Sequence, residues 1–172
     1  MDTVDSRVDP PPRRAARVLV LDAAGRVLLL NVADLERPEN PYWLTPGGGV
    51  EGAEDLVNCA VRELYEETGL RLAPEALCGP VFSETVEFPF DGVWFRQEQD
   101  YFVARTAAWP VIPSALTDEE RRTWLGSRWW SVSELELSTD RIYPPGLAGL
   151  LRSLGPAGLS DPAGLSDPAG GG

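Results

Sequence analysis

The segment from Gly48 to Leu70 constrains this chain more than any other part of its sequence. It runs from a glycine loop into a helical pattern that ends on three carboxylates, Glu63, Glu66 and Glu67. Carboxylates three or four residues apart on a helix repel each other by ~0.2–0.5 kcal/mol per pair, and the helix dipole disfavours anions in the last turn. A divalent cation would offset both costs, because hard cations such as Mg²⁺ bind carboxylate oxygens. The segment therefore predicts a metal site at the end of a helix.

Caps and periodicity place this helix at Leu56–Thr68. Asp55 is a suitable N-cap, and Gly69 suits the left-handed residue that ends many helices. Apolar residues at i, i+3, i+4 and i+7 predict a stripe that faces the core, formed by Val57, Ala60, Val61 and Leu64. Glu63 and Glu67 should lie beside this stripe, so the acids should line the edge of a groove.

The composition indicates one globular domain. The chain has 172 residues, of which 43% are hydrophobic and 24% charged. No apolar stretch approaches the ~20 residues of a membrane span, and the N-terminus lacks the pattern of a secretory signal, so we expect a cytoplasmic protein without membrane contact. The net charge of -12 disfavours binding to nucleic-acid duplexes. It leaves room for a phosphorylated small molecule, because a metal ion can bridge two anions.

The chain contains no histidine. This excludes Ser-His-Asp and Cys-His nucleophile systems, histidine zinc sites and imidazole acid–base catalysis. The two cysteines, Cys59 and Cys78, lack the spacing of a zinc site and are predicted to be small core residues. An enzyme built from this chain must therefore work with carboxylates, basic side chains, tyrosine or a metal.

The remaining sequence predicts runs of strands with helices between them. We expect strands at 16–21, 27–32, 42–45, 77–88, 93–105 and 128–132, turns at 22–25 and 90–92, and further helices at 117–124 and 145–154. This order is typical of an α/β domain with a mixed sheet. Residues 1–14 are predicted to be a flexible leader, and residues 155–172, with a six-residue repeat rich in glycine and proline, a disordered tail. The folded domain should span residues 15–154.

The spacing of Gly48, Glu54 and the run Arg62–Leu70 matches in full the signature of Nudix hydrolases, which this chain therefore resembles. Seven fixed residues, each at ~7% usage, would coincide with a probability on the order of 10⁻⁸. The resemblance implies an α/β/α sandwich with a mixed β-sheet that cleaves a pyrophosphate linked to a nucleoside, using Mg²⁺ or Mn²⁺. The implied partner is a small nucleoside diphosphate derivative, such as an NTP or a nucleotide sugar. A homodimer is left open.

The resemblance also implies roles for single residues. It assigns four metal ligands, which are the carboxylates of Glu63, Glu66 and Glu67 and the backbone carbonyl of Gly47. Glu54 and Arg62 would hold the acidic helix and the loop in register. Such an assignment predicts that these residues lie within contact of one another.

The general base stays unassigned, because proteins of this family often take a further glutamate from the signature segment Gly48–Leu70, here called the box, or from a loop before a late strand. Candidates are Glu63 and Glu66 inside the box and Glu98, Glu119 and Glu120 outside it. We expect Gly48, Gly49, Trp43 and Glu120 to contact the substrate. An aromatic ring in the groove would stack a nucleobase for ~1–3 kcal/mol, although core packing is the commoner role of such rings.

Markers of family subgroups are missing downstream of the box. Thr85 and Val86 stand where ADP-ribose pyrophosphatases have a proline, and Phe88 lies where dinucleoside polyphosphate hydrolases have a tyrosine. Isopentenyl diphosphate isomerases need histidine ligands and are excluded. The second hypothesis is a nucleotide-sensing Nudix-like module that binds without turnover, although such sensors frequently lose the acids present here.

Overall fold

The computed structural model describes residues 12–90 and 93–155. Within these ranges the strands are β1 (Pro12–Leu21), β2 (Val27–Val32), β3 (Tyr42–Leu44), β4 (Gly47–Gly49), β5 (Cys78–Phe90), β6 (Val93–Arg105), β7 (Trp124–Trp130) and β8 (Arg141–Tyr143). The helices are α1 (Leu56–Thr68), the short 3₁₀ helix η1 (Pro74–Ala76), α2 (Asp118–Thr123), α3 (Val132–Leu137) and α4 (Leu147–Leu154). Most of the predicted leader and tail, and the tip of the turn at 90–92, lie outside the described residues.

The strands form one mixed sheet in the order β5-β6-β1-β2-β3-β8, with β4 paired to β1 and β7 to β2. β1 runs parallel to β6 along its whole length. Its other edge is shared, since Ala15–Arg17 pair with β4 and Leu21 pairs with Val27 of β2. This division of one strand edge brings the three glycines of β4 beside the central strand.

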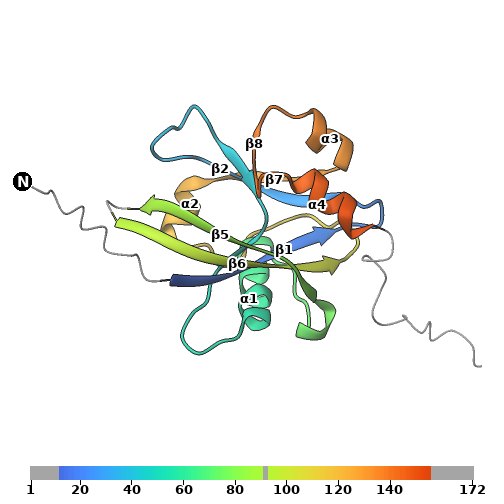
Figure 1. The fold of residues 1–172 in the computed structure, drawn as a ribbon, viewed down its shortest axis with the longest axis horizontal. Coiled ribbons are helices and arrows are strands. Elements are labelled where there is room, and N and C mark those ends of the chain that lie inside the picture. The colour runs from blue at the N-terminus through green and yellow to red at the C-terminus, as the bar shows by residue number, and fades with distance from the viewer. Residues whose placement is uncertain (1–11, 91–92, 156–172) are drawn as a thin grey trace, which may run out of the picture.

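Helices cover both faces of the sheet (Figure 1). Side chains alternate along β1, so Val18 and Val20 point to α1, while Leu19 and Leu21 point to α3 and α4. Each face has its own buried apolar cluster. The predicted α/β/α sandwich with a mixed β-sheet is therefore confirmed.

The ends of α1 are where the sequence predicts them. The Asp55 side chain accepts a 2.8 Å hydrogen bond from the backbone N–H of Asn58. Gly69 has a φ of 76°, the left-handed conformation that costs glycine least. The backbone N–H of Gly69 donates to the carbonyl of Tyr65 and closes the last turn.

The buried face of α1 differs from the predicted stripe. Ala60 and Leu64 are fully buried, but Val57 and Val61 are only half-buried. The other buried residues of α1 are Thr68 and, on the flank away from the valines, Cys59, Glu63 and Glu67. The helix is thus turned so that two of its acids, rather than two valines, face the protein interior. Cys59 is a buried core residue, as predicted.

Several predicted bounds are wrong. β7 covers Trp124–Trp130 instead of 128–132, because Ser131 caps the unpredicted helix α3 in a capping box with Glu134. The last helix begins at Leu147 after Gly146, two residues later than predicted. β4 and β8 were also not predicted. β1 begins at Pro12 and pairs there with Arg96, so the described strand reaches three residues into the predicted leader. No helix among the described residues is long and apolar enough to cross a membrane.

Candidate active site

The glycine loop lies closely against the acidic helix. The backbone N–H of Gly47 donates a 2.8 Å hydrogen bond to Oε2 of Glu67. A Cβ on Gly48 would lie 2.5 Å from the carboxylate carbon of Glu63, and a Cβ on Gly47 would lie 2.1 Å from the carbonyl oxygen of Ala16. Glycine is therefore required at 47, where a Cβ would meet the backbone of β1, while a side chain at 48 would displace the Glu63 carboxylate.

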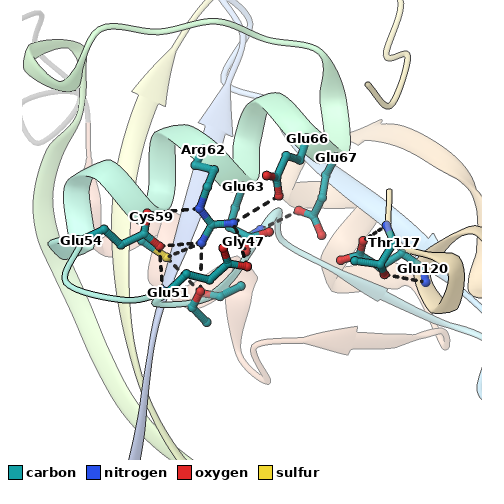
Figure 2. A network of polar contacts seen from close by, with 12 residues as sticks. Gly47, Glu51, Glu54, Cys59, Arg62, Glu63, Glu66, Glu67, Thr117 and Glu120 are labelled. Atoms are coloured by element: carbon teal, nitrogen blue, oxygen red, sulfur yellow. Dashed lines mark hydrogen bonds and ion pairs between the residues drawn. The ribbon is translucent and has the colours of Figure 1, made fainter. Parts of the chain in front are cut away.

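Arg62 connects the loop to the helix (Figure 2). Its Nη2 and Nε donate to the two carboxylate oxygens of Glu54 at 2.6 and 3.1 Å. Nη1 reaches Glu63 at 2.9 Å and Glu66 at 3.2 Å, and Nη2 also donates to the carbonyl of Gly49 at 3.1 Å. The paired guanidinium lowers the pKa of Glu54 to about 2. These contacts are the ones that a residue holding loop and helix in register must make.

Two acids of α1 are buried together with an acid from a distant helix. Glu63 and Glu67 are 7% and 8% exposed. One carboxylate oxygen from each of Glu63, Glu67 and Glu120 lies within 4.8 Å of the other two. We call these three residues the carboxylate cluster. Glu66 is not part of it, because its side chain turns outward to Arg62 and is 31% exposed.

Burial makes Glu63 and Glu67 harder to ionise than ordinary glutamates. It raises the pKa of Glu67 to about 8, against the opposing effects of the Gly47 N–H and the positive charge of Arg17. Burial also raises the pKa of Glu63, although Arg62 acts in the opposite direction. A third acid, Glu120, adds repulsion at both positions. Glu67 therefore needs a further positive charge beside it to be fully ionised at neutral pH.

Glu120 is held in place by the start of α2. Its Oε2 accepts a 2.7 Å hydrogen bond from the backbone N–H of Thr117, and its own N–H donates to the Thr117 hydroxyl at 3.2 Å (Figure 2). Together the two hydrogen bonds form a capping box at the start of α2. The two other outside candidates, Glu98 on β6 and Glu119 on α2, are exposed. Among the three, the structure brings only Glu120 to the acids of α1.

Sequence reasoning missed Arg17. Its Nη1 donates to the carbonyls of Gly47 and Thr45 at 2.9 and 3.4 Å, and its Nε donates to Oε1 of Gln99 at 2.7 Å. The carbonyl of Gly47, which the resemblance assigns to a metal, thus already accepts one hydrogen bond. A signal was present, because Arg17 interrupts the otherwise apolar part of β1, residues 15–21.

The residues that we expect to contact the substrate have different surroundings in the structure. The carbonyl of Gly48 accepts a hydrogen bond from Cys59 Sγ, and the carbonyl of Gly49 accepts one from Arg62. These glycines therefore shape the loop. Trp43 packs edge-on against Trp130 with 5.1 Å between ring centroids, and its indole N–H donates to Asp140 at 3.1 Å. The recorded contacts of Trp43 are therefore those of a packing residue on the α3–α4 face. Burial raises the pKa of the Cys59 thiol to about 11, as expected for an unreactive core cysteine.

A model of the NUDIX domain matches residues 11–149. This chain belongs to the NUDIX domain family. Among curated Nudix relatives, an RNA pyrophosphohydrolase of Dinoroseobacter shibae is 41% identical over 68 residues, which are 40% of this chain and 41% of that protein. An m7GpppN-mRNA hydrolase of Danio rerio is 43% identical over 61 residues, 36% of this chain and 20% of that protein. The matches therefore span less than half of either relative.

Solved Nudix structures share the fold. The MutT protein of Methanosarcina mazei Go1 aligns with a TM-score of 0.61 at 22% identity, covering 89% of this chain and 99% of that one. A C. elegans Ap4A hydrolase in a binary complex aligns with a TM-score of 0.56 at 22% identity, covering 86% and 97%. At this identity the likeness establishes the architecture alone, so the activity must be argued from the site.

Proposed function

We propose that this Nudix protein is a divalent-metal-dependent hydrolase that cleaves the diphosphate linkage of nucleoside-diphosphate derivatives. The observation that carries the proposal is the carboxylate cluster, in which Glu63 and Glu67 of α1 meet Glu120 of α2 within 4.8 Å. Three acids from two separate elements converge at the glycine loop that the family signature specifies. Repulsion among them would oppose this arrangement unless a cation is bound there for part of the working cycle.

The residues present fit a divalent cation. Carboxylate oxygens are the ligands that Mg²⁺ and Mn²⁺ prefer, and the cluster is free of nitrogen and sulfur donors. Members of this family generally use such metals. We assign Glu63 and Glu67 as the holding residues, with Glu66 and the Gly47 carbonyl as further candidates, and leave Glu120 for proton transfer. A divalent cation, when bound, supplies charge for the phosphoryl oxygens and acidifies water.

The chain's own residues supply the rest of the chemistry. Arg62 is paired with Glu54, Glu63 and Glu66, so it neutralises the outer side of the acidic helix and fixes its distance from the loop. Glu120 is our candidate for the general base, because one of its oxygens is held by Thr117 while the carboxylate still reaches the cluster. A base fixed in this way loses little entropy when it takes a proton from water.

The substrate class follows from the shared chemistry of the named relatives. The RNA pyrophosphohydrolase and the mRNA-cap hydrolase are each named for an RNA that carries linked phosphates. We therefore propose a nucleoside joined to at least two phosphates as the ligand. The second hypothesis, a sensor that binds this ligand without turnover, is favoured by no specific contact.

A substrate panel tests the proposal. The panel contains NTPs, nucleotide sugars, dinucleoside polyphosphates and an RNA with a 5′-triphosphate, each assayed with Mg²⁺ or Mn²⁺ for released phosphate, pyrophosphate or nucleoside monophosphate. Turnover that EDTA abolishes supports the hydrolase. Binding without turnover on every member would favour the sensor. Reaction in ¹⁸O-water, followed by mass analysis of the products, then identifies the phosphorus that water attacks.

A further inference from the structure

Only one type of basic side chain is available in this protein to bind phosphate. All 15 basic residues are arginines, and the chain has no lysine and no histidine. A substrate diphosphate brings two or more negative charges to a site that is already acidic. Any side-chain cation that binds it must therefore be an arginine.

Three arginines in the described ranges are half-buried, and they are Arg17, Arg62 and Arg141. Arg62 lies 2.6 Å from a carboxylate oxygen of Glu54, and Arg141 lies 3.0 Å from one of Asp34. Within residues 12–90 and 93–155, Arg17 has no carboxylate within 4.0 Å. Its charge acts on Glu67, whose pKa it lowers, but no ion pair with a described carboxylate compensates its partial burial, so Arg17 is suited to an anionic ligand.

The hydrogen bonds of Arg17 fix its direction and leave part of it free. Nη1 and Nε donate to Gly47, Thr45 and Gln99, whereas Nη2 has no acceptor among the residues described. Arg17 is therefore oriented by neutral oxygens and keeps its whole charge. Two N–H groups of Nη2 remain for a ligand, which is the geometry that guanidinium offers to phosphate oxygens.

Gln99 determines where the Arg17 guanidinium points. This glutamine is 6% exposed, and its Oε1 accepts from both Arg17 Nε and Gln97 Nε2. Its own Nε2 donates to Glu84 at 3.3 Å, and Glu84 accepts a second bond from Tyr101. The amide is thus locked at both ends, so its oxygen cannot turn away from Arg17.

Gly47 lies between Arg17 and the carboxylate cluster. Its carbonyl accepts from Arg17, while its N–H donates to Glu67, so a single residue separates the free guanidinium from a cluster acid. A Cβ on Gly47 would come within 2.9 Å of Arg17 Cδ, so the glycine also makes room for the arginine stem. A diphosphate placed at the cluster would be within reach of Nη2.

We propose that Arg17 binds a phosphate oxygen of the substrate diphosphate beside the carboxylate cluster, and that Gln99 is the residue that positions it. This inference rests on the proposed function and names a binding residue for it. Arg17 supplies positive charge on the side of the diphosphate that faces β1, while Glu63 and Glu67 hold the cation.

Binding of methylenediphosphonate, a diphosphate analogue that is not hydrolysed, tests the proposal. Isothermal titration with saturating Mg²⁺ compares the wild type with Arg17→Gln and with the control Arg152→Gln, which removes an exposed arginine of α4. We expect Arg17→Gln to bind about tenfold to a hundredfold more weakly, as for the loss of a charged hydrogen bond, and the control to match the wild type. Equal affinity in all three proteins would overturn the proposal.

A bracing role of Arg17 in the loop predicts a different pattern. If Arg17 only supported Gly47, its loss would disturb the acids and weaken metal binding itself. We therefore measure Mn²⁺ affinity by electron paramagnetic resonance without the analogue. A dissociation constant for Mn²⁺ within about twofold of the wild type supports ligand binding by Arg17, whereas a loss equal to that seen with the analogue would overturn it.

Gln99→Glu gives a second test that preserves the arginine. The new carboxylate keeps an acceptor for Arg17 Nε but forms an ion pair with it, so the charge available to the analogue falls. It also loses the donor to Glu84, so a circular-dichroism spectrum equal to that of the wild type is a condition of the comparison. Weaker analogue binding with normal Mn²⁺ affinity is expected, and it decides the matter if Arg17→Gln fails to fold. Unchanged analogue affinity in Gln99→Glu would refute the positioning role.

The two proposals can fail separately. A wild type that binds methylenediphosphonate through Arg17 but hydrolyses no member of the panel would defeat the proposed hydrolase and leave this inference intact. Hydrolysis with the same KM in wild type and Arg17→Gln would support the proposed hydrolase and overturn the role of Arg17 in binding.

Discussion

Oε2 of Glu67 accepts a 2.8 Å hydrogen bond from the backbone N–H of Gly47, which ties the last turn of α1 to the glycine loop. Glu67 has an oxygen in the carboxylate cluster as well, so one side chain links the loop to the proposed metal position. Movement of the loop would therefore disturb the cluster directly. The glycine run and the acids act as one unit because this contact joins them.

Glu67→Gln tests the catalytic side of this link. Glutamine keeps an oxygen that can accept from Gly47, so the fold should be preserved, but it cannot supply a negative charge to a cation. We expect kcat to fall by on the order of 10² or more on the best panel substrate, with an unchanged circular-dichroism spectrum. The control is Glu119→Gln, an exposed acid of α2 outside the cluster. Turnover near the wild-type level in Glu67→Gln would refute the assignment.

Added Mg²⁺ should stabilise the folded protein. A ligand that binds only the folded state at about 100 times its dissociation constant adds ~2.7 kcal/mol, which corresponds to roughly 5–10 °C in Tm for a chain of this size. Glu63→Gln removes one ligand of the carboxylate cluster, so its shift in Tm should be clearly smaller. Differential scanning calorimetry with Mg²⁺ and with EDTA measures both. Equal shifts in the two proteins would place the stabilising ion elsewhere.

The metal-free protein should lose stability between pH 5 and pH 8. Glu67 has a pKa of about 8 in the folded state, compared with 4.5 for an ordinary glutamate. Between these values the unfolded chain has released its proton while the folded chain retains it, so stability falls as pH rises. Below pH 4.5 both states are protonated and the effect vanishes. The full loss, reached above pH 8, is on the order of a few kcal/mol.

Glu67→Gln provides the matched comparison for this pH effect. The uncharged amide removes the titration, so Tm measured in EDTA should change less with pH in the variant than in the wild type. The absence of histidine helps, because no imidazole titrates in the same window. Parallel pH profiles for the two proteins would show that Glu67 does not carry the effect.

The sequence predicted the bounds of α1 because its signals are local. Asp55, the periodic apolar residues and Gly69 act within a few positions of one another, and so do Thr117 and Glu120 in the capping box of α2. The spacing of the glycines and acids then identified the candidate site. Local signals of this kind do not depend on the rest of the fold.

Features that depend on distant contacts were not predicted. β4 consists of three glycines, which have low strand propensity, and it forms a strand only because β1 pairs with it. The direction of Glu66 is set by Arg62 rather than by its place in the box. Arg17 and Gln99 are separated by 82 positions and meet because β1 and β6 are parallel neighbours. No periodicity in the sequence reports these pairings.

Gly48→Ala tests whether the close approach of loop and helix is needed for the site. The added Cβ would lie 2.5 Å from the carboxylate of Glu63, so this carboxylate must move away. Glu63 is the acid of the carboxylate cluster that lies against the glycine loop. Its displacement should therefore lower both Mn²⁺ affinity and turnover at least tenfold. The control is Gly149→Ala on α4, where a Cβ meets no atom within 4 Å and helix propensity should raise stability by up to ~1 kcal/mol. Retained Mn²⁺ affinity in Gly48→Ala would mean that the position of Glu63 does not define the metal site.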